Sequence, residues 1–113
     1  MVKKYELVLD DSIEFSGQKL SRIRALISFD EVKTGDLGGY IQSEKNLSQD
    51  GNAWVANKAK VSGNAKVWGN AKVFGEAEVS GNAKVYNRAE VWGNATDIVT
   101  GKHRLKQIGR AHV

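Results

Sequence analysis

Apolar and polar residues alternate along the middle of this chain, from Gly51 to Ile98. Small apolar residues occupy odd positions there, whereas lysine, glutamate and large aromatic residues occupy even ones. This two-residue period is that of a β-strand, in which successive side chains point to opposite faces, and it drifts against the period of a helix. The pattern therefore predicts β-structure with one small apolar face and one polar face that carries scattered rings.

The alternation belongs to a repeat six residues long, whose consensus is Gly-Asn-Ala-x-Val-x. Its copies follow one another without a gap and read GNAWVA, NKAKVS, GNAKVW, GNAKVF, GEAEVS, GNAKVY, NRAEVW and GNATDI. A short fixed period is typical of a solenoid, in which each repeat packs on its neighbours. Because the repeated positions hold packing and turn residues, the pattern also argues against most classes of enzyme.

Each copy contains one position that predicts a corner. Strands usually run about 3–10 residues, so a chain of this length must bend repeatedly. The odd position that is neither Ala nor Val holds only glycine or asparagine, the residues that best tolerate positive φ. These corner residues are Asn57, Gly63, Gly69, Gly75, Gly81, Asn87 and Gly93. Short parallel strands joined by such corners predict a β-helix.

The repeats resemble the hexapeptide repeat of left-handed β-helices, in which a small residue follows an aliphatic one by four positions. Val55 and Ala59 show this spacing, as do Val61 and Ala65. Glycine follows the aliphatic residue by two positions here, whereas the acyltransferase pattern more commonly has it one position after. The resemblance implies an all-β, left-handed parallel β-helix of about three triangular coils, each made of three hexads.

Residues 1–36 precede the repeats and predict a cap for the open end of the β-helix. A terminal coil would otherwise expose unpaired backbone and apolar core. The apolar pattern indicates strands over Tyr5–Leu9 and Arg22–Phe29, with a turn at Gly17 between them. We therefore expect an N-terminal β-hairpin seated on the first coil.

Residues 37–99 are expected to form the β-helix itself, since Ile41 and Leu47 already show the six-residue spacing. Val55 follows Leu47 by eight positions, which predicts a bulge of two residues at a corner. Residues 100–113 break the repeat and carry basic but no acidic residues. For this segment a frayed tail and a short helix over the last coil both stay open.

Length and composition exclude several classes of protein. A chain of 113 residues makes one domain with a thin core and no deep cleft. It has no cysteine, which suits a cytoplasmic protein, and no apolar run approaches the roughly 20 residues of a membrane span. The net charge of +4 is concentrated in residues 100–113. We therefore expect no membrane partner and no strongly basic repeat surface.

The chain offers little catalytic chemistry. Its two histidines, His103 and His112, both lie outside the repeats. A zinc anhydrase built on a β-helix needs three histidine ligands on its coils, and the acyltransferases of this fold use a histidine base at a trimer interface. The glycine-rich run Gly35–Gly39 lacks the Gly-Lys-Ser/Thr of a phosphate-binding loop. We expect no catalytic residue, metal or cofactor, and keep a trimeric acyltransferase-like enzyme that uses His103 as an alternative.

The polar face carries the candidate recognition residues. If three hexads close a coil, Trp68 stacks with Tyr86 and Phe74 stacks with Trp92. Exposed rings are enriched at interfaces, so a partner protein or self-association is expected there. Shielding of the coil edges and stacking of nucleic-acid bases stay open, although the charge is dilute for a groove that follows phosphates. The candidate partner-binding residues are Trp54, Trp68, Phe74, Tyr86, Trp92, Lys66 and Lys84.

Four segments carry a wider resemblance: Arg22–Leu26, Gly35–Ile41, Glu44–Ser48 and Gly51–Val55. In these segments the chain is similar to small phage- and prophage-encoded proteins known as hexapeptide-repeat or polymer-forming-like proteins. The resemblance implies a phage protein in the cytoplasm of a bacterial host cell, and it implies no catalytic residue.

These observations together predict a non-catalytic binding protein that associates with and inhibits a host protein, such as a CRISPR effector or another defence complex. The first alternative is a self-assembling structural solenoid that forms homo-oligomers through its aromatic faces. The second is the acyltransferase-like enzyme.

Overall fold

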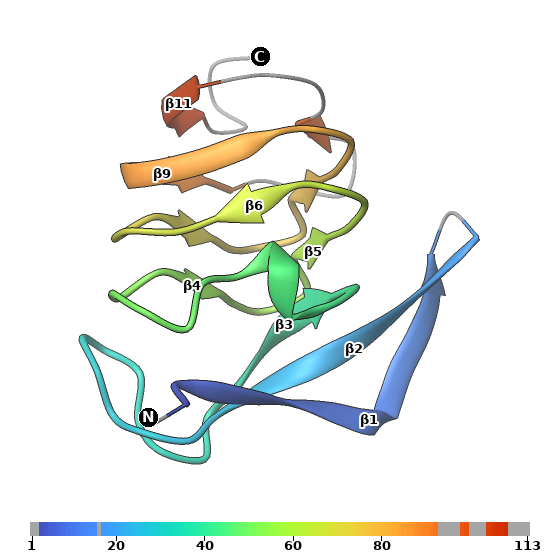
Figure 1. The fold of residues 1–113 in the computed structure, drawn as a ribbon, viewed down its shortest axis with the longest axis vertical. Helices are drawn as coiled ribbons and strands as arrows, with labels where there is room; N and C mark the ends of the chain where they lie inside the picture. The colour runs from blue at the N-terminus through green and yellow to red at the C-terminus, as the bar shows by residue number, and fades with distance from the viewer. Residues whose placement is uncertain (1–2, 16, 93–97, 100–103, 109–113) are drawn as a thin grey trace.

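The computed structural model describes residues 3–15, 17–92, 98–99 and 104–108. The regular secondary structure of these residues is nearly all β, as predicted, with a single 3-10 helix among them (Figure 1). In chain order the elements are β1 (Tyr5–Phe15), β2 (Gln18–Ala25), β3 (Leu37–Ile41), η1 (Glu44–Asn46), β4 (Trp54–Val55), β5 (Lys60–Val61), β6 (Lys66–Val67), β7 (Lys72–Val73), β8 (Glu78–Val79), β9 (Lys84–Val91), β10 (Ile98–Val99) and β11 (Arg104–Ile108).

The repeats form short parallel strands stacked in layers of three hexads. Val55 pairs with Val73, Val61 with Val79, and Val67 with Val85. Each of these partners lies 18 residues further along the chain, the interval that three hexads give. Figure 1 shows the result as parallel ribbons piled one above another, with the β1–β2 hairpin beneath them.

The interior of the stack contains the small odd-numbered residues that the alternation predicted. The buried alanines are Ala53, Ala59, Ala65, Ala71, Ala77, Ala83 and Ala89, and the buried valines are Val55, Val61, Val67, Val73, Val79, Val85 and Val91. From Gly51 to Val85, each of these alanines lies between a corner residue and the next strand, and each of these valines lies in a strand. The repeat therefore fixes the core directly.

Glycine and asparagine turn the chain at the corners, as predicted. Positive φ values are found at Asn57 (58°), Gly63 (65°), Gly69 (72°), Gly75 (70°), Gly81 (66°) and Asn87 (58°). This left-handed region is favourable for glycine and tolerated by asparagine, and a Cβ disfavours it in most other residues. The seventh expected corner, Gly93, lies outside the residues that the structure describes.

The expected two-residue bulge is confirmed by a change of register. Ile41 pairs with Val61 and Leu47 forms a bridge with Val67, so each partner is 20 residues away. For the pairings that start at Val55, Val61, Val67 and Val73 the interval is 18 residues. The two additional residues therefore lie between Leu47 and Val55, where the chain turns at Gly51 with a φ of 73°.

The N-terminal hairpin is present, with limits that differ from the sequence expectation. β1 and β2 pair antiparallel, and β2 also pairs antiparallel with β3. β1 runs on to Phe15, whereas β2 ends at Ala25 instead of Phe29. After Ala25 the chain turns back, because Phe29 pairs with Val32 and the Ala25 N–H donates to the carbonyl of Asp36.

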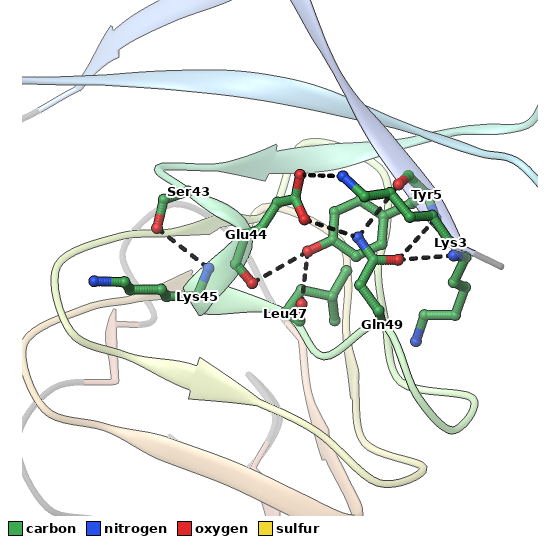
Figure 2. Close-up of polar contacts among 8 residues, drawn as sticks. Lys3, Tyr5, Ser43, Glu44, Lys45, Leu47 and Gln49 are labelled. Atoms are coloured by element: carbon green, nitrogen blue, oxygen red, sulfur yellow. Dashed lines mark hydrogen bonds and ion pairs between the residues drawn. The ribbon is translucent and has the colours of Figure 1, made fainter. Parts of the chain in front are cut away.

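Polar contacts attach the start of the hairpin to the chain around η1 (Figure 2). The Tyr5 hydroxyl donates to the carbonyl of Leu47 at 2.6 Å, and the side-chain oxygen of Gln49 accepts the N–H groups of Lys4 and Tyr5. The Lys3 ammonium pairs with Glu44 at 3.0 Å. Gln49 lies in the bulge, and its side-chain oxygen accepts the N–H groups at the start of β1 as the backbone carbonyl of a neighbouring strand would.

The C-terminal segment corrects one expectation. Residues 104–108 form β11 in place of a frayed tail or a short helix, and they pair in parallel with β9. β10 pairs in parallel with β8 in the same way. The upper edge of the stack exposes backbone groups that need hydrogen-bond partners, and a further strand satisfies them where a helix would not.

Candidate partner-binding surface

Two pairs of aromatic rings stack on the outside of the layers. The ring centroids of Trp68 and Tyr86 are 4.8 Å apart with planes at 9°, and those of Phe74 and Trp92 are 5.8 Å apart at 7°. All four residues occupy the last position of their hexads, so the 18-residue register places each ring beside its partner one layer away. Neighbouring strands lie about 4.8 Å apart, which is a suitable distance for parallel ring stacking.

Both stacks reach the solvent. Trp68 is 37% exposed, and the other three rings are half-buried. A stacked pair presents two rings in one fixed orientation, so little side-chain freedom remains to be lost when a partner covers them. The sequence prediction that these four rings lie on the polar side in two vertical pairs is confirmed.

Lys66 and Lys84 lie directly opposite each other in the pairing of β6 with β9. Both side chains are exposed. They precede Trp68 and Tyr86 by two residues, so the four side chains share one face of the strands. Like charges at opposite positions repel, so the pair lowers the stability of the layers. We call Trp68, Tyr86, Phe74, Trp92, Lys66 and Lys84 the aromatic surface; it extends over two sides of the layers, the first stack beside β6 and the second beside β7.

Trp54, the remaining candidate, does not belong to that surface. It is only 6% exposed and lies in the core, where the hairpin and the loop after β2 cover the first layer. Its ring makes edge-to-face contacts with Phe29 at 5.3 Å and with Tyr5 at 6.4 Å. Trp54 occupies the fourth position of the first hexad, and residues 1–36 cover that layer. The repeat could not reveal this, because the covering residues come from outside it.

A groove beside the aromatic surface was not predicted from the sequence. It has a volume of about 590 Å³ and lies between the loop after β2 and the outer face of β4 and β7. Acidic residues of the loop, among them Asp30 and Asp36, line one side, and Phe74 lines the other. The loop residues follow no repeat, and only the local acidic run at Asp30-Glu31 marks them in the sequence.

Within residues 3–15, 17–92, 98–99 and 104–108, no group of three or more His, Cys, Asp or Glu side chains is placed to hold a metal ion. His103 and His112 lie outside those ranges. No helix within them has the length and apolar character that a membrane span requires.

Comparison with known proteins adds no assignment. No family model matches this chain, and no curated protein matches its sequence.

Proposed function

We propose that this chain is a left-handed parallel β-helix of phage or prophage origin that acts as a non-catalytic binding protein. The 18-residue register supports the β-helix, as do the corner residues with positive φ. The proposed role is to associate with a host protein in the bacterial cytoplasm and to inhibit it by covering a functional surface. A CRISPR effector or another defence complex is the class of target that fits a phage-encoded inhibitor.

The observation that carries this proposal is the pair of ring stacks on the outside of the layers. Tryptophan and tyrosine are the residues that most often dominate the binding energy of protein interfaces. A stack held by the layer register is rigid before binding, so its surface is available without a cost of ordering. Lys66 and Lys84 beside the first stack favour an acidic patch on the partner, since their mutual repulsion is relieved when carboxylates approach.

The test begins with affinity capture of the tagged protein in its bacterial host, followed by mass spectrometry. The test variant replaces Trp68, Phe74, Tyr86 and Trp92 with alanine. The control variant is Ser80→Ala, because Ser80 follows β8, which pairs with β5 and β10 and not with the strands beside the ring stacks. Circular dichroism and thermal unfolding establish that both variants keep the fold. Each captured candidate is then purified, and its affinity and activity are measured with all three proteins.

The proposal predicts one discrete host protein whose activity falls when this chain is added. The four-alanine variant should bind it more than tenfold more weakly, while Ser80→Ala binds normally. Equal binding by the four-alanine variant would rule out the aromatic surface as the site. Recovery of the tagged protein alone, in oligomers that the four-alanine variant no longer forms, would favour the self-assembling solenoid.

A further inference from the structure

The groove beside the aromatic surface is formed by two parts of the chain that lie far apart in the sequence. Its outer wall is the loop between β2 and β3, and its floor is the face of β4 and β7. Figure 1 shows this loop running alongside the lower layers. Trp54, Ala56 and Phe74 contribute to the floor. Leu37 also lines the groove and is 53% exposed, so apolar surface is open to a ligand there.

The loop that forms the wall is held in place. The Gly35 N–H donates to the carbonyl of Ala25 at 2.8 Å, and the ring of Phe29 packs edge-on against Trp54. The carboxylate of Asp30 accepts a hydrogen bond from the ammonium of Lys72, on the floor side. These contacts fix the loop at its end, at Phe29 and at Asp30, so the groove is formed before any ligand enters it.

The charge of the groove is negative. Four carboxylates line it, those of Asp30, Glu31, Asp36 and Glu90, against the ammonium of Lys72, while Arg88 lines an adjoining hollow that shares Asp30, Lys72 and Glu90. The excess is therefore three negative charges, in a protein whose net charge is +4. Lys72 and Glu90 are register partners on the floor, whereas the other three carboxylates come from the loop.

Lys72 shows which kind of group this arrangement favours. Its hydrogen bond to Asp30 raises its pKa above the ordinary value, and the negative charges of Asp30, Glu31 and Glu90 add to this rise although partial burial opposes it. The groove thus stabilises a cation on an aliphatic stem. Glu31 and Glu90 are exposed and form no ion pair among the described residues, so they are open to a second cation.

We propose that the groove receives an arginine or lysine side chain of the partner protein. The inference rests on the proposed function, because it names the chemistry that the partner presents next to the aromatic surface. The methylene stem packs on the apolar floor, and the charged head lies among the carboxylates of Glu31 and Glu90. Phe74 belongs both to a ring stack and to the groove lining, so one partner surface spans both sites.

The test uses the whole protein, labelled with nitrogen-15, and two blocked tripeptides. One is acetyl-Leu-Arg-Leu-amide, and the other replaces arginine with citrulline, which has nearly the same shape and no charge. We expect the arginine peptide to shift the backbone amide signals of groove residues, including Leu37 and Phe74, and the citrulline peptide to bind at least fivefold more weakly. High salt should weaken the arginine peptide further.

Matched variants locate the binding to the groove. Glu31→Gln with Glu90→Gln removes two carboxylates and keeps both residues of the Asp30–Lys72 hydrogen bond, and should weaken the arginine peptide about fivefold. Glu76→Gln removes an exposed carboxylate that does not line the groove, and should leave the affinity unchanged. Equal binding of the two peptides, shifts confined to residues outside the groove, or unchanged affinity in the double variant would each overturn the inference.

The same double variant separates this inference from the proposed function. If a captured partner is lost on alanine substitution of the four rings and kept by Glu31→Gln with Glu90→Gln, the aromatic surface stands and the groove inference is overturned. If the arginine peptide binds the groove and the four-alanine variant still binds its partner, the cation site is supported and the proposed role of the rings fails.

Discussion

The side-chain nitrogen of Lys4 lies 2.6 Å from the carbonyl oxygen of Ala53 and 3.3 Å from that of Gly51. Within the layers, such carbonyls accept from the layer beneath; the Asn52 N–H, for example, donates to Gly69. Residues 51–56 belong to the first full layer, so among the described residues no strand below them donates to these two carbonyls. The side chain of Lys4 supplies the hydrogen-bond donor instead.

Asn46 does the same at another corner of this layer. Its side-chain nitrogen donates to the carbonyls of Gly63 and Ala65, at 3.2 and 2.8 Å. Its side-chain oxygen accepts the N–H groups of Gln42 and Ser43. Asn46 is fully buried, and both ends of its amide are satisfied. Two side chains from outside the repeats thus close the lower end of the stack.

Lys4 predicts a rise in stability between pH 8 and 10. Burial lowers the pKa of Lys4 from 10.5 to about 8, although the nearby charge of Asp50 opposes the shift. In this window the unfolded chain binds more protons than the folded one, so the free energy of unfolding increases with pH, by up to about 1 kcal/mol per pH unit. The neutral amine keeps two N–H donors for the two carbonyls. Urea unfolding at several pH values measures the slope.

Tyr5 sets the upper limit of that window. Burial, together with the charge of Glu44, raises the pKa of Tyr5 above its ordinary 10.0. The contribution of the neutral phenol is therefore complete below pH 10 and declines as the pH rises further. Lys4→Met should flatten the slope between pH 8 and 10 and leave the decline above it. A Lys4→Met protein with the original slope would show that another group titrates.

Removing the Asn46 amide should be costly. Asn46→Ala leaves two buried carbonyls and two N–H groups without these partners, and we expect a loss of about 2–4 kcal/mol in the free energy of unfolding. Asn64→Ala is the control, because Asn64 occupies an exposed repeat position and should change stability by less than about 0.5 kcal/mol. Chemical denaturation compares the two. A similar loss in both variants would contradict the capping role of Asn46.

Two glycines with similar φ separate backbone strain from steric conflict. Gly17 has a φ of 77° and nothing within 4 Å of an added Cβ, whereas at Gly51 (φ 73°) a Cβ would lie 2.6 Å from the carbonyl oxygen of Gly69. Gly17→Ala should cost about 1–2 kcal/mol from the left-handed conformation alone. Gly51→Ala should cost at least about 1 kcal/mol more, because one layer must move away from the next. Thermal unfolding measures both, and equal losses would show that the layers separate easily.

The repulsion between Lys66 and Lys84 is open to a double-mutant cycle. Lys66→Glu places opposite charges at paired positions and should stabilise the fold by about 0.2–1 kcal/mol. The increase in stability from Lys66→Glu should be smaller when Lys84 is replaced with glutamine, because the new carboxylate then has no positive charge opposite it. If Lys66→Glu stabilises equally in both backgrounds, the pairing of β6 with β9 is not its cause. Binding to an acidic partner should weaken in the same variant.

The candidate site could be predicted in part. The register of six-residue repeats determines that Trp68 meets Tyr86 and that Phe74 meets Trp92, because each pair differs by three repeats. It could not determine that Trp54 is buried, because Trp54 has the same even-numbered position as the exposed rings and is covered by Phe29, which lies outside the repeats. The groove was equally hidden, since Asp30 and Lys72 are joined only when the loop folds back over β7.

The sequence by itself determined the interior and the corners of this protein. A six-residue period keeps Ala and Val on one side of every strand and puts Gly or Asn where φ must be positive, so local geometry suffices. The tertiary structure alone decided how the ends are closed. Lys4 and Asn46 serve as substitute donors, and residues 104–108 form a strand, because unpaired backbone at the edge of a layer must find partners wherever the chain offers them. Such pairings join residues distant in sequence, and no local pattern records them.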